Sequence, residues 1–226
     1  MTWKICASVT ARTLATIEAM VLTSEAQGAD LIEVRLDYLQ ETPDLPQIRR
    51  LTAIPLIATN RSPQEGGLFT GSDAVRLQPL FAAAAAGFEY VDLEVATPAV
   101  ETVVAKLKAA SPVKVILSHH DFQKTPGLKD LHRIFQQEQA AGADVCKIVS
   151  TARAAEDNLT CLRFTSQASQ QHAVICFCMG KAGIPSRLFS PLLGGFMTYA
   201  AVTRGMEAAS GQLTLADTRH FYELFT

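Results

Sequence analysis

The chain has 226 residues, a mass of 24.4 kDa and a formal net charge of −2 at pH 7. This length suits one large domain with a sizeable core, and the nearly neutral charge gives no electrostatic reason to expect a nucleic acid or a membrane as partner. With 48% hydrophobic and 19% charged residues, the composition is that of an ordinary globular protein, whose ligand we expect to be small.

Short β-rich runs recur along the chain, and a longer stretch of helical character follows each of them. The runs cover residues 4–9, 31–36, 55–59, 90–93, 113–118, 145–149 and 173–178. The stretches between them carry apolar residues at helical spacing, and two of these stretches reach Gly28 and Gly142, which suit helix C-caps. This alternation predicts parallel strands with right-handed crossovers.

An eighth strand decides between an open sheet and a closed barrel. Residues 195–202 fit such a strand, and residues 215–225 then supply the helix that closes the barrel. No Pro/Gly/Ser-rich linker, charge block or repeat interrupts the pattern, and the nicotinamide fingerprint G-x-G-x-x-G is absent. We therefore expect an α/β fold, a (β/α)8 TIM barrel, as a single catalytic domain over residues 1–226.

The cysteines and the amino-terminal residues indicate the cellular compartment of the protein. The five cysteines are Cys6, Cys146, Cys161, Cys176 and Cys178. Their odd number, without the paired C-x-x-C spacing of zinc sites, indicates reduced thiols in a cytoplasm and no structural disulfide. No secretory signal pattern is visible, and the alanine-rich residues 81–86 are far too few to span a bilayer.

The second predicted strand contains charge where a covered parallel strand should be apolar. Its alternation places Glu33 and Arg35 on one face and apolar residues on the other. The apolar face suits the helix layer, so the charged pair should point into the barrel. There the two side chains either form a structural ion pair or bind substrate hydroxyl groups at the catalytic end of the barrel.

Two loops that follow predicted strands carry arginines. Arg61 precedes Glu65-Gly66-Gly67 after the third strand, and Arg187 follows the seventh strand near a helix start. Both loops fall at the catalytic end of a barrel, and a guanidinium group there suits a bidentate grip on a carboxylate. The alternative for each arginine is a solvated loop charge.

His119 and His120 stand at the end of the fifth predicted strand, within Ser118-His119-His120-Asp121-Phe122. Barrel active sites are assembled at this end, and a histidine can act there as an acid and a base near neutral pH. Adjacent strand residues face opposite ways, so at most one of the two histidines should face the site. The alternative is a structural, hydrogen-bonded histidine. Further ligands at metal-site spacing are missing, and we expect no metal.

Lys147 lies in the middle of the sixth predicted strand, flanked by β-branched residues, so its side chain should point inside. Burial disfavours an ammonium ion and so favours the uncharged amine that condenses with a ketone. The alternatives are a lysine that reaches water from a shorter strand, or one that is paired with an acid.

Taken together, five elements in chain order resemble type I 3-dehydroquinate dehydratase, the Schiff-base class of that shikimate-pathway enzyme. The elements are Glu33-Val34-Arg35, Arg61 with Glu65-Gly66-Gly67, Ser118-His119-His120-Asp121-Phe122, Lys147, and Ser186-Arg187. The resemblance extends over nearly the whole chain, from residue 5 to residue 212. Each element alone is weak, but the ordered set is specific.

The resemblance implies a role for each matching residue. Lys147 resembles the lysine that forms the imine with the ring ketone, His120 the catalytic histidine, and Glu65 the carboxylate that orients this histidine. Arg187 matches the arginine that binds the substrate carboxylate. The positions that match family contacts to the ring substituents are Ser8, Glu33, Arg35 and Arg61. Gln212 matches a glutamine on a mobile loop that covers the site.

One segment departs from the family pattern. Where the family commonly has Ser-Ala-Pro-Gly-Gln, this chain has Ala208-Ala209-Ser210-Gly211-Gln212, so Ala208 lacks a hydroxyl group that contacts substrate, and Ser210 is only a weaker candidate to replace it. Phe122, Phe177 and Met179 are further, weaker candidates for the pocket lining. That placement of Phe177 and Met179 leaves Cys176 and Cys178 on the opposite strand face as packing residues.

The implied activity is a hydro-lyase reaction on 3-dehydroquinate that needs no cofactor. Two alternatives are a class I aldolase, which would explain Lys147 equally well, and a catalytically silent barrel that binds a metabolite. The family offers homodimers as a precedent for the oligomeric state, and related domains are fused to a shikimate dehydrogenase in some organisms.

Overall fold

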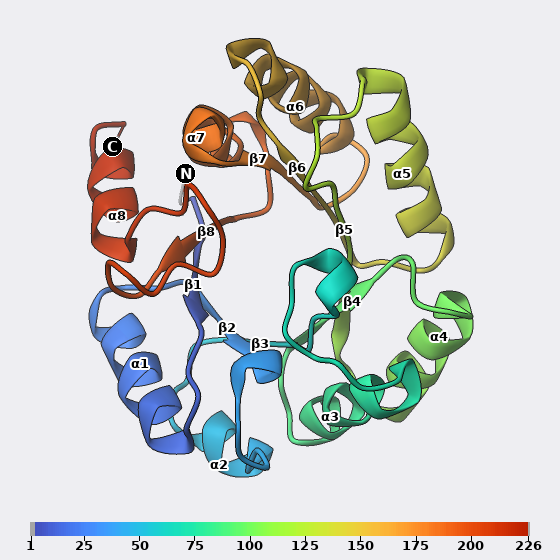
Figure 1. The fold of residues 1–226 in the computed structure, drawn as a ribbon, viewed down its shortest axis with the longest axis vertical. Helices are drawn as coiled ribbons and strands as arrows, with labels where there is room; N and C mark the ends of the chain where they lie inside the picture. The colour runs from blue at the N-terminus through green and yellow to red at the C-terminus, as the bar shows by residue number, and fades with distance from the viewer. Residues whose placement is uncertain (1–2, 226) are drawn as a thin grey trace.

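The computed structural model describes residues 3–225, which contain eight parallel β-strands. The strands are β1 (Ile5–Val9), β2 (Leu31–Arg35), β3 (Leu56–Thr59), β4 (Tyr90–Glu94), β5 (Lys114–His120), β6 (Val145–Thr151), β7 (Val174–Met179) and β8 (Thr198–Ala201). They pair in the order β7-β6-β5-β4-β3-β2-β1-β8, which curls the sheet into a barrel (Figure 1). A backbone hydrogen bond from Phe196 N to Val174 O, 2.7 Å long, links the two ends of the sheet.

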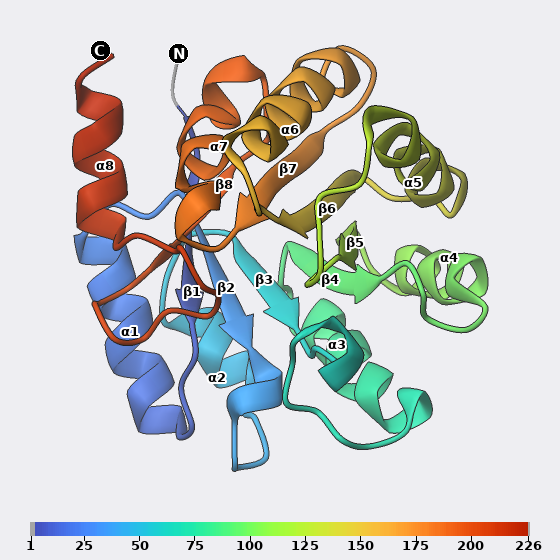
Figure 2. The same ribbon diagram turned by 45° about the horizontal axis from the view of Figure 1, so that its top comes forward.

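The helices surround the strands as an outer ring (Figures 1 and 2). They are α1 (Leu14–Ala26), α2 (Leu45–Arg50), α3 (Asp73–Ala85), α4 (Val100–Ala110), α5 (Leu128–Ala140), α6 (Ala155–Ala168), α7 (Ile184–Phe189) and α8 (Leu215–Glu223). Four 3₁₀ turns join them within residues 3–225: η1 (Leu36–Tyr38), η2 (Pro63–Glu65), η3 (Lys181–Gly183) and η4 (Pro191–Leu193). The predicted (β/α)8 barrel is thus confirmed.

Local sequence signals explain the ends of several elements. Thr13 caps α1 by accepting a hydrogen bond from Thr16 N at 3.2 Å, and Gly28 follows this helix with a φ of 76°. The strand β8 is shorter than the predicted 195–202, because Gly194 and Gly195 still belong to the turn after η4. Strands β5 and β6 extend past their predicted ends at residues 118 and 149, and the added residues at each end include a polar residue next to the following loop.

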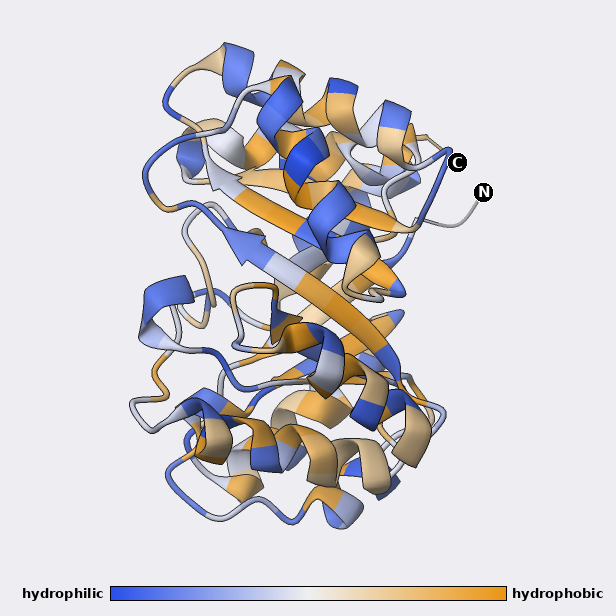
Figure 3. Ribbon diagram, turned by 90° about the vertical axis from the view of Figure 1, so that its right-hand side faces the viewer, coloured by the Kyte–Doolittle hydropathy of each residue, from blue (hydrophilic) through white to orange (hydrophobic). Residues whose placement is uncertain are grey.

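The core has two parts that follow from the alternation of side chains along each strand. Outward-facing residues such as Ile32 and Val34 pack against the helices. Inward-facing apolar residues fill the lower part of the barrel, and they include Cys6, Leu31, Ile57, Tyr90, Ile116, Val145, Ile175 and Met197. The apolar colour of the strands against the more polar outer helices is visible in Figure 3. A solid floor therefore limits any cavity to one end of the barrel.

All five cysteines are buried and free. Cys176 and Cys178 pack between the strands and the helices, and Phe177 lies on the inner face of β7, as predicted. The sulfur atoms of Cys161 and Cys178 lie 3.4 Å apart. Within residues 3–225 no helix combines the length and the apolar character that a membrane crossing requires.

Glu138 is an exception in the apolar layer between α5 and β6, because its side chain is fully buried. Its polar neighbours are the Cys146 thiol and the Lys147 backbone, yet neither carboxyl oxygen has a hydrogen-bond partner among the described residues. Burial raises the pKa of Glu138 well above its ordinary value. The folded chain therefore holds Glu138 as an uncharged acid and loses stability as the pH rises toward that pKa.

Replacing Glu138 with methionine, which has a similar shape, should stabilise the fold. We expect Glu138→Met to raise the free energy of unfolding at pH 7 by about 1–3 kcal/mol, since a buried group without hydrogen bonds is removed. The gain should grow with pH, because the wild-type acid is driven to ionise. Urea unfolding at several pH values measures both effects, with Gln136→Met on the exposed side of α5 as the control. An unchanged or lower stability would contradict this account of Glu138.

Candidate active site

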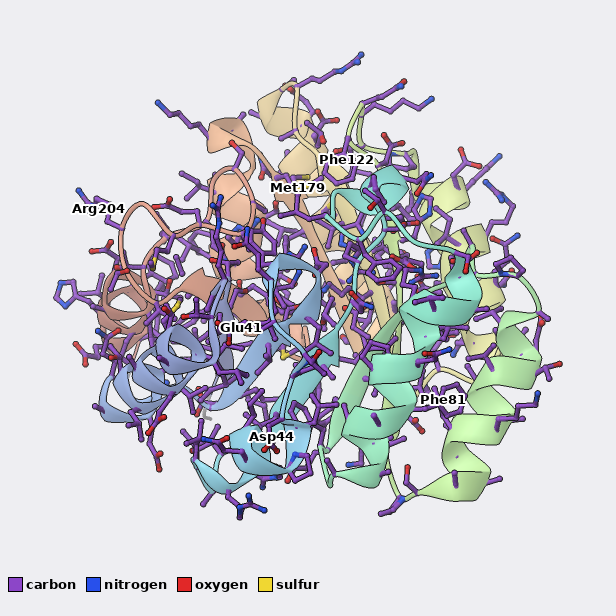
Figure 4. The ribbon with its side chains drawn as sticks, turned by 60° about the horizontal axis from the view of Figure 1, so that its bottom comes forward. Glu41, Asp44, Phe81, Phe122, Met179 and Arg204 are labelled. Carbon is purple, nitrogen blue, oxygen red and sulfur yellow. The ribbon has the colours of Figure 1, made fainter. Side chains whose placement is uncertain are left out.

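A cavity of about 460 Å³ opens at the carboxyl ends of the strands. The structure brings together in its wall every residue that the family resemblance assigned to the site: Ser8, Glu33, Arg35, Arg61, Glu65, His120, Phe122, Lys147, Phe177, Met179, Arg187, Ser210 and Gln212. Figure 4 labels Phe122 and Met179, which lie near one another at this end of the barrel, while Arg204 lies out on a loop. The roles of these residues remain predictions, but their shared location makes a joint role possible.

Lys147 reaches into the cavity from β6, and its ammonium group is paired. Its Nζ donates to Asp92 Oδ2 at 2.7 Å, and Glu33 Oε1 lies 3.9 Å away. Only 5% of the residue is exposed. Of the alternatives open from the sequence, a lysine paired with an acid is therefore the one that the structure shows, and the acid comes from β4. Such pairing holds the amine at a fixed point in the lumen.

Asp92 connects two cations. Besides Lys147, its carboxylate pairs with Arg61 Nη2 at 2.7 Å and accepts a hydrogen bond from Ser118 Oγ at 2.7 Å. Burial opposes ionisation of this carboxyl, but the charges of Arg61 and Lys147 outweigh it and hold the pKa of Asp92 well below its ordinary value. Arg61 is 3% exposed and also donates to Ser118. It is therefore no solvated loop charge.

Glu33 and Arg35 both face the lumen, as the strand alternation predicted, but they do not pair with each other. Glu33 accepts hydrogen bonds from Ser8 Oγ at 3.0 Å and from Thr59 Oγ1 at 2.9 Å. Arg35 instead forms a two-pronged contact with Asp37, at 2.9 Å and 2.7 Å. The alternative of a Glu33–Arg35 ion pair is therefore wrong, and each residue keeps atoms directed toward the cavity.

His120 forms a hydrogen-bonded pair with Glu65. Its Nδ1 lies 2.7 Å from Glu65 Oε2, and its backbone N–H donates to the same oxygen at 3.0 Å. Burial raises the pKa of Glu65 to about 7, although Arg61 opposes the shift. Burial, together with Arg61 and Lys147, lowers the pKa of His120 well below its ordinary value. The histidine is thus uncharged at neutral pH, and a proton on the pair belongs to Glu65.

The surroundings of His120 fix its orientation. The ring of Phe122 stacks on it at 6.2 Å between centroids, and this same ring touches Gly66, where a Cβ atom would lie 2.4 Å from it. Gly66 also has a φ of 77°, so this position favours glycine for two reasons. His119 does not line the cavity, which agrees with the expectation that at most one of the two histidines faces the site.

Arg187 is a buried cation without a counter-charge. It is 2% exposed, and its Nε and Nη2 atoms have no hydrogen-bond partner within residues 3–225. The guanidinium lies 4.3 Å from the centroid of Phe177, and burial lowers the pKa of Arg187 to about 10. A buried guanidinium group without a counter-charge is suited to bind an anion. Its N–H donors have the fork geometry that a carboxylate fits.

Gln212 closes over the cavity from the loop between β8 and α8. Its Nε2 donates to Ser8 Oγ at 3.2 Å, and its Oε1 accepts from Ala208 N at 2.7 Å. Gly211 packs so closely on the backbone of Gly180 that a Cβ atom would lie 2.3 Å from Gly180 O. The side chain of Ser210 is exposed at the cavity edge. This loop is therefore docked on the barrel in the structure.

The lumen residues missed from the sequence include Asp92, Glu94 and Tyr199. The rule that singled out Glu33, an ionisable residue inside a covered strand, applies equally to Asp92 and Glu94 in β4 and would have found them. Tyr199 in β8 lines the cavity beneath Lys147, and no sequence signal separates it from an ordinary core tyrosine.

Comparisons with known proteins agree on one family. The family model described as type I 3-dehydroquinase matches residues 5–226. A 3-dehydroquinate dehydratase of Desulfotalea psychrophila is 37% identical over 221 residues, which cover 97% of this chain and 96% of that protein. A bifunctional 3-dehydroquinate dehydratase/shikimate dehydrogenase of Arabidopsis thaliana is 34% identical over 226 residues, 96% of this chain but 36% of that protein.

A solved structure is similar over the whole barrel. The type I 3-dehydroquinate dehydratase of Clostridium difficile, solved with covalently modified comenic acid, superposes with a TM-score of 0.90 at 25% identity, over 99% of this chain and 92% of that one. The fold and the family therefore agree across the chain.

The Asp92 cluster generates a stability prediction. Asp92→Asn should lower the free energy of unfolding by about 3–5 kcal/mol, because it leaves Arg61 and Lys147 as buried cations without their shared carboxylate. Urea unfolding at pH 7 measures the loss. Asp130→Asn is the matched control, since Asp130 pairs with Arg133 on the surface at 3.3 Å, and it should change stability by less than about 1 kcal/mol. Equal effects of the two variants would refute the role given to Asp92.

Proposed function

The chain belongs to the type I 3-dehydroquinase family, and on that premise we propose that it dehydrates 3-dehydroquinate to 3-dehydroshikimate through an imine on Lys147. The overall activity, that of a hydro-lyase, follows from the family and from curated relatives of matching length. The observation that carries the mechanism is the meeting of a buried lysine amine, a histidine–carboxylate pair and an unmatched arginine in one cavity.

Imine formation begins at Lys147 Nζ. The Lys147 ammonium first gives up a proton, and the resulting amine attacks the carbonyl carbon of the ring ketone. That proton and a second one from Nζ leave with the carbonyl oxygen as water, so that a positively charged C=N–H group joins enzyme and substrate. This iminium withdraws electrons and acidifies the neighbouring ring carbon. Asp92, 2.7 Å from Nζ, supplies a negative charge beside the cation. The chain thus needs no cofactor as an electron sink, and we propose none.

Proton transfer falls to His120. With Glu65 ionised, Nδ1–H of His120 donates to Glu65 Oε2, and the other ring nitrogen carries the lone pair that can take the proton from the ring carbon. The resulting enamine expels the β-hydroxyl group, which leaves as water with the proton that His120 returns. Hydrolysis of the remaining imine releases the product and restores the lysine amine. Protons and charge balance over the cycle.

Arg187 is our candidate for the substrate carboxylate, because it is the buried cation whose donors lack partners among the described residues. Ser8, Glu33, Arg35 and Arg61 stand around the lumen with polar atoms suited to the ring hydroxyl groups. Gln212 and the more weakly assigned Ser210 would cover the bound ring and exclude water. Phe122, Phe177 and Met179 would supply apolar walls.

The wider setting is also proposed. The reaction belongs to the shikimate pathway of aromatic amino acid biosynthesis. The five free cysteines support a reducing cytoplasm, and a homodimer is the assembly that we expect from the family. A single catalytic domain over residues 1–226 accords with the one barrel that residues 3–225 form. The small-molecule partner is 3-dehydroquinate, and we expect neither nucleic acid nor membrane.

The mechanism is tested by trapping the imine. Incubation with 3-dehydroquinate and borohydride should place a reduced adduct on Lys147, located by peptide mass spectrometry, and enone absorbance should appear without borohydride. His120→Ala should keep the adduct but lose about 10²–10⁴-fold in elimination rate. Lys147→Arg is the control without an adduct. Turnover by Lys147→Arg would refute the covalent route, and an adduct without any enone from the wild type would favour another reaction, such as that of an aldolase.

The Glu65–His120 pair predicts a pH profile. Below pH 7 Glu65 is protonated and donates a hydrogen bond to His120 Nδ1. The neutral ring then carries its hydrogen on Nε2, the nitrogen that is needed as the base. We therefore expect kcat/KM to rise with pH through about 7, the pKa to which burial raises Glu65. Glu65→Gln should be slower and should lack this inflection. Steady-state kinetics from pH 5 to 9 measure both, and an inflection near 7 that persists in Glu65→Gln would assign it to another group.

A further inference from the structure

Tyr199 approaches the reactive nitrogen from a different strand of the barrel. It lies in β8, in register with Cys6 of β1, and Lys147 Nζ stands 4.3 Å from the centroid of its ring. Only β7 stands between β6 and β8 once the ends of the sheet meet, so this contact joins two strands that are not adjacent. Tyr199 is 5% exposed and lines the cavity, and its ring packs on Phe177 with 6.3 Å between centroids.

We propose that the face of the Tyr199 ring stabilises the positive charge at Lys147 Nζ, and in particular the charge of the iminium formed there. The part of this proposal that concerns the iminium rests on the proposed function. A lysine nitrogen over an aromatic face within about 6 Å is attracted by the negative face of the ring, and the attraction is strongest where water is excluded. Both conditions hold at this buried contact.

The charge balance of imine formation explains why a ring suits this place. An ammonium group and a ketone give an iminium group and water, so one positive charge stands at Nζ before and after the step. The ammonium has three N–H donors, whereas the iminium has one. On condensation Nζ therefore has fewer N–H groups to direct at Asp92, to which it donates, and at Glu33, 3.9 Å away, while attraction to a ring face requires no N–H group. When the ring is removed, the ammonium can still direct its N–H groups to these carboxylates, whereas the iminium has only one N–H group. Loss of the ring therefore costs the iminium more than the ammonium.

The hydroxyl group of Tyr199 has no part in this proposal. Its oxygen is buried without a hydrogen-bond partner among the described residues. Burial, with Glu33 next, raises the pKa of Tyr199 well above its ordinary value, so the ring stays uncharged. Packing against Phe177 and the apolar floor holds the ring in place. A phenylalanine would accordingly present the same face to Nζ.

The test separates imine formation from elimination by using the His120→Ala background. The trapped fraction of Lys147, measured by intact mass after borohydride, is followed against 3-dehydroquinate concentration. Tyr199→Phe should reach half-trapping within about twofold of the parent, whereas Tyr199→Leu should need roughly 10- to 30-fold more substrate. Fluorinated phenylalanines at residue 199, which weaken the face charge at nearly constant size, should raise that concentration stepwise.

Tyr90→Leu is the matched control. Tyr90 also lies in the lumen, but in the apolar floor, and the lysine over its ring is Lys114 at 5.8 Å. This variant should lower the melting temperature without changing the trapping curve. A Tyr199→Phe loss equal to that of Tyr199→Leu would assign the effect to the hydroxyl group and overturn the proposal. So would trapping curves that do not respond to fluorination.

A second measurement tests the contact without substrate. The ring current of Tyr199 should shift the Lys147 ε-methylene NMR signals upfield in the wild type and in Tyr199→Phe but not in Tyr199→Leu, with Lys147→Arg providing the assignment. Failure of the wild type to form any adduct would refute the proposed function, while this shift would still decide whether the ring faces Nζ. An adduct formed equally well by Tyr199→Leu would refute the role of Tyr199 alone.

Discussion

The carboxylate of Asp92 is the interaction on which the site depends. Burying Lys147 and Arg61 in one narrow lumen would bring two like charges together in a medium of low polarity, which is unfavourable unless a negative charge stands between them. Asp92 lies 2.7 Å from each cation and is itself fully ionised because of them. Its position at the start of the polar layer also marks where the apolar floor of the barrel ends. The lysine can therefore be both buried and fixed.

The remaining charges are arranged so that one cation is left over. Arg35 is matched by Asp37, and Arg61 and Lys147 share Asp92 with Glu33 and Glu94 nearby. Arg187 faces an aromatic ring instead of an acid, and its lowered pKa reflects this lack of compensation. Such a guanidinium is costly in the unliganded enzyme, and the cost is recovered when an anion binds. The lack of an acidic partner for Arg187 thus suits its guanidinium group to bind a carboxylate.

Sequence patterns predicted the positions of several site residues because, in a parallel barrel, a charged residue inside a strand must face the lumen or the loops. That constraint placed Glu33, Arg35 and Lys147 correctly, and loop position did the same for Arg61 and Arg187. Pairing was harder: partners such as Asp37 for Arg35 and Asp92 for Lys147 depend on rotamers and on strand register, which alternation does not determine. Glu138 shows a related limit: its spacing from Leu131 and Phe135 puts it on the core face of α5, but the pattern does not reveal that its carboxyl group lacks a hydrogen-bond partner there.

The loop over the cavity shows why one departure from the family pattern need not open the site. Gln212 is held by a hydrogen bond from the backbone N–H of Ala208, which any residue at 208 except proline can donate. Its amide also reaches Ser8, and through Ser8 the network continues to Glu33 in the lumen. Loop closure is therefore encoded in backbone and barrel groups rather than in the side chain at 208. The alanine leaves the covering glutamine in place, so the lack of a side-chain hydroxyl group at position 208 should affect substrate affinity rather than the architecture of the site.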